Sequence, residues 1–277
     1  MEVCALTKQV LGVLNKAGIN EKSDAEFLVA LSLGINRNDV YSNIDVCAKN
    51  CKKVAKLAKK RAKGIPLSLI FNSANFYGRD FYVNKHCLCP RPETEELVEW
   101  AIGCGLKNKS VLDLCTGSGA IGITISLEEK PQKVVLSDIS TKALKVAQKN
   151  AKNLGADVKI IKSDLFKKIN EKFDVIISNP PYISASDYSM LEPEVKNHEP
   201  KLALCGGQTG LEFYEKIILD APKYLNKGGK IYFELGIDEA TSVKKMLEKD
   251  FIDIEIKKDY AGIDRMICAT LKGGNKC

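Results

Sequence analysis

Residues 110–122 read SVLDLCTGSGAIG, and this stretch decides the fold of the chain. It begins with an apolar run, Val111 to Leu114, that is typical of a buried strand. Glycines at 117 and 119 follow, where positive φ angles are permitted and the backbone can approach a ligand closely. The next apolar residues predict a helix, whose unpaired N-terminal N–H groups favour negative charge. The stretch therefore predicts a strand, a ligand-binding turn and a helix in succession.

Strand and helix patterns alternate on the C-terminal side of this stretch. The predicted strands are 110–114, 133–138, 158–161, 173–179, 229–235, 251–256 and 265–271. Such alternation is typical of a doubly wound α/β fold with a seven-stranded, mostly parallel sheet. The gap between the last two strands is too short for a helical crossover, so we expect the final strand to run antiparallel.

The N-terminal part of the chain has a different pattern. Residues 1–65 contain no proline and show apolar residues at helical spacing, which predicts a small helical bundle. Residues 66–90 alternate aromatic and polar side chains around Gly78-Arg79-Asp80, which predicts a β-hairpin linker. We therefore expect a helical recognition domain over 1–65, a hairpin linker over 66–90 and an α/β domain over 91–277.

Composition sets limits on the class of protein. The 277 residues carry 42 basic and 35 acidic side chains, a net charge of +7, and are 45% hydrophobic, enough for one or two globular domains. Lys49 to Lys63 holds eight cations and no anion. A solvated helix face is the simplest interpretation, and contact with nucleic acid or an acidic surface is the alternative.

The sequence also predicts where the protein resides. No apolar run approaches the roughly 18–20 residues that a membrane span requires, and the N-terminus lacks the order of a signal peptide. The ten cysteines form no Cys-x-x-Cys pair. We therefore expect a soluble cytoplasmic protein with reduced thiols, no bound metal and no contact with a membrane.

The glycine turn by itself fits two nucleoside ligands. Gly117, Gly119 and Gly122 satisfy a dinucleotide fingerprint, which is weak support on its own. Asp113, at the strand end, suits the sulfonium and ammonium groups of S-adenosylmethionine better than a pyrophosphate. Asp138 ends the next strand, where its carboxylate can accept hydrogen bonds from the ribose hydroxyls. We favour S-adenosylmethionine over a nicotinamide dinucleotide.

The third strand is followed by Ser163-Asp164-Leu165-Phe166. Asp164 is placed to accept a hydrogen bond from an adenine amine, with Leu165 against the ring. A helix N-cap is a comparable interpretation of Asp164. The sequence leaves these alternatives open.

The fourth strand ends in Asn179-Pro180-Pro181-Tyr182, the strongest signal in the chain. Two prolines fix φ and remove two donors, leaving a stiff row of carbonyls at the ligand-binding edge of the sheet. The Asn179 side-chain oxygen and the Pro180 carbonyl can accept both N–H bonds of a planar nitrogen and orient it toward a methyl group. Tyr182 would pack over donor or substrate. The tetrapeptide predicts methyl transfer to an amide or an aromatic amine.

Several motifs in order now resemble one family. They are Asn75 to Gly78, Pro90 to Glu95, the glycine turn, Asp138, Asn179 to Tyr182, Glu199 to Leu204, Gly206-Gly207 and Glu234 to Gly236. In these motifs the chain resembles the bacterial peptide chain release factor glutamine methyltransferases (PrmC/HemK). The resemblance implies a Rossmann-like class I methyltransferase fold behind a small helical domain. It also implies S-adenosylmethionine as donor, S-adenosylhomocysteine as product, and the glutamine of the release-factor Gly-Gly-Gln loop as acceptor.

The resemblance assigns roles to residues. It implies that the methionine end of the donor lies on the turn formed by Cys115, Thr116, Gly117, Ser118 and Gly119. It also implies Asp138 for ribose, Asp164-Leu165 for adenine, and Asn179 with Pro180, Pro181 and Tyr182 for the substrate glutamine. Arg91 and Glu95 either line the substrate channel or form a helix start with first-turn acids. Cys115 replaces a glycine common in the family, and Leu165 replaces an aromatic present in some members.

Three alternatives share part of the pattern. Asn-Pro-Pro-Tyr also occurs in methyltransferases that act on exocyclic amines of DNA or RNA bases. A sibling enzyme methylates a ribosomal-protein glutamine, although Pro90 to Glu95 fits it less well. A nucleoside-dependent binding module would leave the row of carbonyls without a use.

Overall fold

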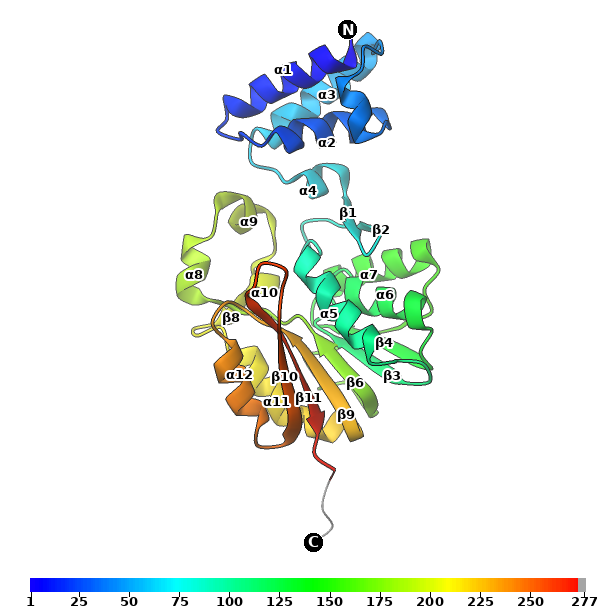
Figure 1. Cartoon of the computed structure of the whole chain (residues 1–277), viewed down its shortest axis with the longest axis vertical. Coiled ribbons are helices and arrows are strands. Elements are labelled where there is room, and N and C mark those ends of the chain that lie inside the picture. The colour runs from blue at the N-terminus through cyan, green and yellow to red at the C-terminus, as the bar shows by residue number, and fades with distance from the viewer. Residues whose placement is uncertain (274–277) are drawn as a thin grey trace. The chain divides into compact units, whose positions relative to one another are not determined.

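The computed structural model describes residues 1–273 and divides into two compact units (Figure 1). The first unit holds residues 1–73 together with a short segment, 192–198. The second unit holds residues 74–191 and the described residues from 199 onward. The chain therefore returns to the first unit shortly after the Asn179–Tyr182 tetrapeptide.

Amphipathic helices build the first unit. They are α1 (Val3–Asn15), α2 (Lys22–Leu33), the 3₁₀ helix η1 (Arg37–Tyr41), α3 (Ala48–Arg61) and α4 (Leu67–Phe71). Their apolar faces form one core around the buried Leu6, Leu14, Leu28 and Val54. The predicted helical bundle is confirmed. Helix α4 was not predicted, because five residues are too few to show a helical period.

The cations of residues 49–63 are not equivalent. Arg61 is buried, and its Nε lies 2.6 Å from the Asp24 carboxylate. Arg61 also forms an ion pair with Glu194 of α9 (Pro193–His198), the helix that the first unit takes from the later part of the chain. The seven lysines are exposed. Arg61 therefore stabilises the first unit, and Lys53 donates to the Ser32 carbonyl at 2.9 Å, whereas the other lysines are available to solvent or to a partner.

The predicted hairpin is present but shorter than expected. Strands β1 (Ser73–Phe76) and β2 (Arg79–Tyr82) form a two-stranded sheet. The turn is Tyr77-Gly78, with φ angles of 51° and 71°, so Arg79 belongs to the second strand and not to the turn. Phe76 and Phe81 are buried and pack edge to face at 5.8 Å.

The second unit contains a seven-stranded sheet (Figure 1). Its strands are β3 (Ser110–Leu114), β4 (Lys133–Asp138), β5 (Lys159–Lys162), β6 (Phe173–Ser178), β9 (Leu225–Glu234), β10 (Phe251–Lys258) and β11 (Asp264–Leu271). The order is β10-β11-β9-β6-β3-β4-β5. Neighbours pair in parallel from β9 to β5, and β11 runs antiparallel to both β9 and β10. The predicted fold class and the antiparallel final strand are confirmed.

Alternate residues of the sheet feed two apolar cores. Val111 and Ile177 pack in one core with residues of α5 (Pro92–Gly103), α6 (Ala120–Glu129) and α7 (Thr141–Leu154). Leu112 and Ile176 pack in the other core with residues of α11 (Glu212–Tyr224) and α12 (Ala240–Leu247). Because successive side chains of a strand point to opposite faces, both faces of the sheet are covered.

A segment between β6 and α11 was not predicted. It contains β7 (Ile183–Ser184), α8 (Ala185–Met190), α9, α10 (Lys201–Leu204) and β8 (Cys205–Gly207). Strands β7 and β8 pair in parallel, which returns the chain to the end of the tetrapeptide. Elements of two to six residues show no period that a sequence pattern can report.

Two features are absent from the part of the chain that the structure describes. No helix within residues 1–273 has the length and apolar character needed to cross a membrane. Within the same residues, no three histidine, cysteine, aspartate or glutamate side chains come together as a metal site. The nine cysteines among them are free thiols.

Candidate active site

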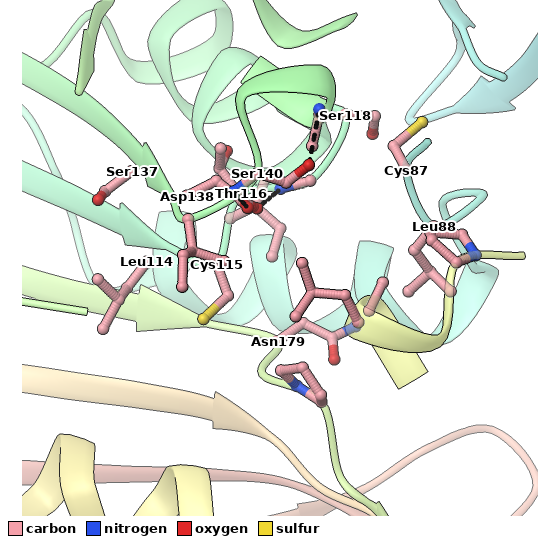
Figure 2. A pocket seen from close by; sticks show the side chains of 18 of the residues that line it. Cys87, Leu88, Leu114, Cys115, Thr116, Ser118, Ser137, Asp138, Ser140 and Asn179 are labelled. Atoms are coloured by element: carbon pink, nitrogen blue, oxygen red, sulfur yellow. Dashed lines mark hydrogen bonds between the residues drawn. The ribbon is translucent and has the colours of Figure 1, made fainter. Parts of the chain in front are cut away.

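A cavity of about 200 Å³ lies at the carboxyl ends of β3, β4 and β6 in the second unit (Figure 2). Most of the lining residues that were predicted from the sequence come from the loops that follow these strands. The lining includes Cys115, Thr116, Gly117, Ser118, Asp138, Asp164, Leu165, Asn179 and Pro181. The structure thus brings most of the predicted donor residues and part of the tetrapeptide to one cavity.

Backbone geometry explains the glycine turn. Gly117 and Gly119 have φ angles of 56° and 85°, in the left-handed region that glycine tolerates. A Cβ on Gly119 would lie 2.7 Å from Ile123 Cδ1 and 3.2 Å from Ala147 Cβ. Cys115 has a φ of 62°, which costs a non-glycine residue about 1–2 kcal/mol. This strain is the physical reason for glycine to be preferred at position 115.

Asp113 shapes the turn from inside the protein. Its carboxylate is fully buried, and Oδ2 accepts hydrogen bonds from the Thr116 hydroxyl and from Gly122 N–H. Its Oδ1 is buried without a partner among the described residues. Asp113 does not line the cavity, so its position does not support direct contact with a sulfonium. The two hydrogen bonds turn this carboxylate toward the first turn of α6.

The Asp138 carboxylate, unlike that of Asp113, lines the cavity. Its Oδ2 accepts Gly117 N–H at 2.9 Å and its Oδ1 accepts Ser140 N–H at 2.8 Å. Figure 2 shows Asp138 and Ser140 close to Thr116. Each oxygen keeps a lone pair for a further donor. Burial raises the pKa of the Asp138 carboxyl.

The adenine side of the predicted pocket is a turn and not a helix. Asp164 is half-exposed, and its carboxylate lies 2.6 Å from Lys167 Nζ. No helix begins at Asp164, so the N-cap alternative is wrong. Leu165 has a φ of 46° and lines the cavity together with Phe213 of α11. Sequence reasoning missed Phe213, because α11 is distant in the sequence and its aromatic residues look like core residues.

Asn179 lies immediately after β6 and is held by its amide nitrogen. Nδ2 donates to the Thr94 hydroxyl at 3.3 Å, and that hydroxyl donates to Glu234 Oε2 at 2.6 Å. Within residues 1–273, Asn179 Oδ1 and the Pro180 carbonyl accept no hydrogen bond. Asn179 lines the cavity, so its side-chain oxygen is an acceptor available to a substrate.

The other predicted substrate residues lie away from the cavity lining. The Tyr182 hydroxyl donates to Glu234 Oε1 at 3.5 Å, and burial raises its pKa. Arg91 lies 2.5 Å from the Glu199 carboxylate. Glu95 accepts the backbone N–H of Tyr77 at 2.9 Å and so braces the hairpin turn. The structure does not bring Pro180, Tyr182, Arg91 or Glu95 to the cavity lining.

Comparison with known proteins identifies the family. The Methyltransferase small domain model matches residues 100–195. The chain is 37% identical to the release factor glutamine methyltransferase of Bacillus cereus, over 98% of this chain and all of that protein. It is 40% identical to that of Clostridium acetobutylicum, over 91% of each chain. The chain belongs to the release factor glutamine methyltransferase family.

Solved structures agree on the fold of this family member. A methyltransferase from Pyrococcus furiosus matches with a TM-score of 0.56 and 21% identity, over 80% of this chain and 98% of that chain. A T. thermophilus 16S rRNA N2 G1207 methyltransferase in complex with AdoMet and guanosine matches with a TM-score of 0.52 and 18% identity. That match covers 72% of this chain and 50% of the other. At these identities the similarity concerns the fold alone.

The cavity of this family member fits S-adenosylmethionine. A carboxylate with spare lone pairs, Asp138, lies at one side, and backbone N–H groups of the glycine turn lie beside it. Leu165, Ile121 and Phe213 add apolar surface that suits a purine ring. Polar and apolar walls of this kind match a nucleoside that carries charged groups at one end.

Replacing Asp138 by asparagine should weaken donor binding. The change removes the negative charge that receives the Gly117 and Ser140 N–H groups, and charge-assisted hydrogen bonds contribute more than neutral ones. We expect the Kd for S-adenosylmethionine in calorimetry to rise by about 10–100-fold. Asp157→Asn, at an exposed position outside the cavity lining, is the matched control and should leave the Kd unchanged. An unaltered Kd in Asp138→Asn would remove Asp138 from the donor site.

The buried carboxyl groups predict a pH-dependent stability. Burial raises the pKa of Asp113 and of Glu234 to about 7. Between the ordinary carboxyl pKa and about 7, the folded protein keeps protons that the unfolded chain releases. Stability is therefore fully present at low pH and is lost as the pH rises through this window. We expect the free energy of unfolding, measured in urea without donor, to fall between pH 5 and pH 8.

Asp113→Asn should make this fall smaller by about 2–4 kcal/mol, because the amide does not titrate. Asp174→Asn is the control. Burial alone would raise the pKa of Asp174, but hydrogen bonds from Ser110 and Asn226 lower it, so it is ionised throughout this pH range. A fall of the same size in Asp113→Asn and in the unmodified protein would contradict the prediction.

Proposed function

We propose that this protein transfers a methyl group from S-adenosylmethionine to the side-chain amide nitrogen of the glutamine in the Gly-Gly-Gln loop of peptide chain release factors. This transfer would modulate translation termination. The observation that carries the proposal is the acceptor Asn179 Oδ1 on a cavity suited to a nucleoside, with the Pro180 carbonyl next to it in the chain. The release factor glutamine methyltransferases of B. cereus and C. acetobutylicum support the choice of substrate.

The chemistry explains why two acceptors are needed. The lone pair of a carboxamide nitrogen is delocalised into its carbonyl, so the nitrogen is a poor nucleophile. Asn179 Oδ1 and the Pro180 carbonyl would each accept one N–H of the substrate amide, orient its nitrogen and stabilise the positive charge that develops on it. S-adenosylmethionine, when bound, supplies an electrophilic methyl group and leaves as S-adenosylhomocysteine. The N–C bond would form as the S–C bond to the methyl group breaks, and one amide proton would be lost to solvent.

Donor and protein substrate would be held by different residues. Asp138 would accept the ribose hydroxyls, the Cys115–Gly119 turn would hold the methionine end, and Asp164 with Leu165 would contact adenine. Asn179, Pro180 and Pro181 would receive the glutamine. Tyr182 would act through Glu234 and not by direct packing.

The N-terminal region is proposed to recognise the release factor. Residues 1–65 would form the recognition domain, 66–90 the linker and 91–277 the methyltransferase domain. The seven exposed lysines of Lys49–Lys63 would attract an acidic surface or nucleic acid at the site of translation termination. With this role the protein would act in the cytoplasm.

A labelling comparison tests the function. The protein is incubated with S-adenosylmethionine that carries a labelled methyl group and one of four acceptors. These are a release factor, the same factor with its loop glutamine replaced by alanine, a ribosomal-protein fraction, and DNA or RNA. We expect label on the intact factor alone. Label on nucleic acid or on a ribosomal protein, and none on the factor, would overturn the proposed substrate.

A further inference from the structure

A buried hydrogen-bonded network joins both ends of the tetrapeptide to two residues distant in the sequence. Thr94 lies in the first turns of α5, and Glu234 is the last residue of β9. They are 4% and 2% exposed, so bulk water does not compete for their hydrogen bonds. Glu234 accepts a hydrogen bond from the Thr94 hydroxyl on Oε2 and one from the Tyr182 hydroxyl on Oε1. The Thr94 oxygen in turn accepts a hydrogen bond from Asn179 Nδ2.

When Glu234 is ionised, the donors and acceptors in this network have a fixed direction. A hydroxyl has one proton, and Thr94 uses it to donate a hydrogen bond of 2.6 Å to the Glu234 carboxylate. The lone pairs of the Thr94 oxygen can only accept hydrogen bonds. They therefore favour the orientation of the Asn179 amide in which its N–H group faces Thr94. The oxygen of Asn179 is left for the cavity. If the Asn179 carboxamide were rotated by about 180°, its N–H groups would face the N–H groups of the substrate amide, and the two sets of donors would repel each other.

The network also affects the strength of the acceptor. An amide that donates through its nitrogen becomes more polarised, which increases the negative charge on its oxygen. The Glu234 carboxylate, as the final acceptor, polarises the Thr94 hydroxyl, and this hydroxyl in turn polarises the Asn179 amide. The Tyr182 bond ties the far end of the tetrapeptide to the same carboxylate.

We propose that Thr94 and Glu234 are positioning residues for methyl transfer, which fix the Asn179 amide with its oxygen toward the substrate nitrogen. This inference rests on the proposed role of Asn179 as an acceptor. It assigns a function to two side chains that do not themselves accept the substrate amide. It predicts that the effect of Thr94 on turnover passes through Asn179.

A double-mutant cycle tests the inference. Thr94→Val keeps the shape of the side chain and removes its hydroxyl, whereas Thr94→Ser keeps the hydroxyl and serves as the matched control. We expect Thr94→Val to lower kcat by about 10–100-fold, with Thr94→Ser within about threefold of the unmodified protein. In the Asn179→Ala background, Thr94→Val should change kcat by less than about twofold, because the amide it positions is gone.

One stability measurement and one binding measurement separate positioning from loss of structure. Thermal unfolding and the Kd for S-adenosylmethionine are measured for every variant, and we expect the Kd of Thr94→Val to stay within about twofold of the unmodified protein. If Thr94→Val does not fold, Thr94→Ala replaces it in the same cycle. An equal loss of kcat in both backgrounds would overturn the inference. So would an unchanged kcat in Thr94→Val, or an equal loss in Thr94→Ser.

These outcomes differ from a failure of the proposed function. If the unmodified protein methylates nucleic acid or a ribosomal protein and not the release factor, the substrate assignment fails. The cycle is then run on the acceptor that is methylated. Coupling between Thr94 and Asn179 on that acceptor would still support the positioning role, and additive losses would still overturn it.

Discussion

Asn179→Ala should lower kcat for methylation of the release factor by about 10²–10³-fold, the effect of removing one preorganised group that stabilises developing charge. The physical reason is that one of the two proposed oxygen acceptors is lost, while the Pro180 carbonyl remains. The donor pocket keeps its carboxylate and its glycine turn, so we expect the Kd for S-adenosylmethionine to change little. Single-turnover rates with labelled donor, together with calorimetric donor binding, measure the two effects separately.

Asn153→Ala is the matched control for this variant. Asn153 is exposed near the end of α7 and does not line the cavity, so both kcat and donor affinity should be unchanged. A kcat of Asn179→Ala within about threefold of the unmodified protein would show that Asn179 does not stabilise the transition state. An equal loss in donor affinity and in kcat would place Asn179 in the donor site instead.

Gly206→Ala should damage both stability and turnover, because the residue packs on the backbone of the tetrapeptide. A Cβ at this buried position would lie 2.6 Å from the Pro181 carbonyl oxygen and 2.8 Å from Tyr182 Cα. Backbone atoms cannot rotate away as a flexible side chain can, so Pro181 and Tyr182 must shift. We expect a loss of about 3 kcal/mol in unfolding free energy. A displaced acceptor pair should lower kcat by about 10²-fold.

Gly12→Ala provides the comparison for Gly206→Ala. Gly12 lies inside α1, and a Cβ there meets no atom within 4 Å. Alanine should stabilise the helix by about 0.5–1 kcal/mol and leave methylation unchanged. Urea unfolding and turnover are measured for both variants. A Gly206→Ala protein with unmodified stability and turnover would mean that the tetrapeptide backbone tolerates displacement.

The regular elements of the fold were predictable where their patterns are long. The expected strand 110–114 matches β3, and 133–138 matches β4, because each is an apolar run bounded by polar or glycine residues. The strand expected at 229–235 is β9, which begins earlier, at Leu225. Gly228 and Gly229 interrupt its apolar pattern, and the pairing of β9 with β6 shifts register in the same region.

The site was predictable only in part, because its hydrogen bonds join residues far apart in the sequence. Thr94 and Glu234 belong to motifs that mark the family, yet no local pattern indicates that they contact each other. Phe213 lines the cavity from α11, whose apolar residues otherwise serve the core. Arg91 and Glu95 lie in a motif of the family too, but Glu199 and the Tyr77 N–H occupy their charged groups.

The sequence by itself determined the chemistry at the strand ends: a glycine turn, carboxylates, and a tetrapeptide whose prolines expose carbonyl oxygens. Local backbone constraints suffice for this, since glycine and proline act on φ wherever they occur. Only the tertiary structure decided which of these groups face the cavity. Asp113 and Asp138 both lie at the ends of parallel strands, yet Gly122 N–H and the Thr116 hydroxyl turn Asp113 inward while Asp138 lines the cavity. The orientation of a carboxylate depends on donors supplied by neighbouring elements, and those come into reach only when the chain has folded.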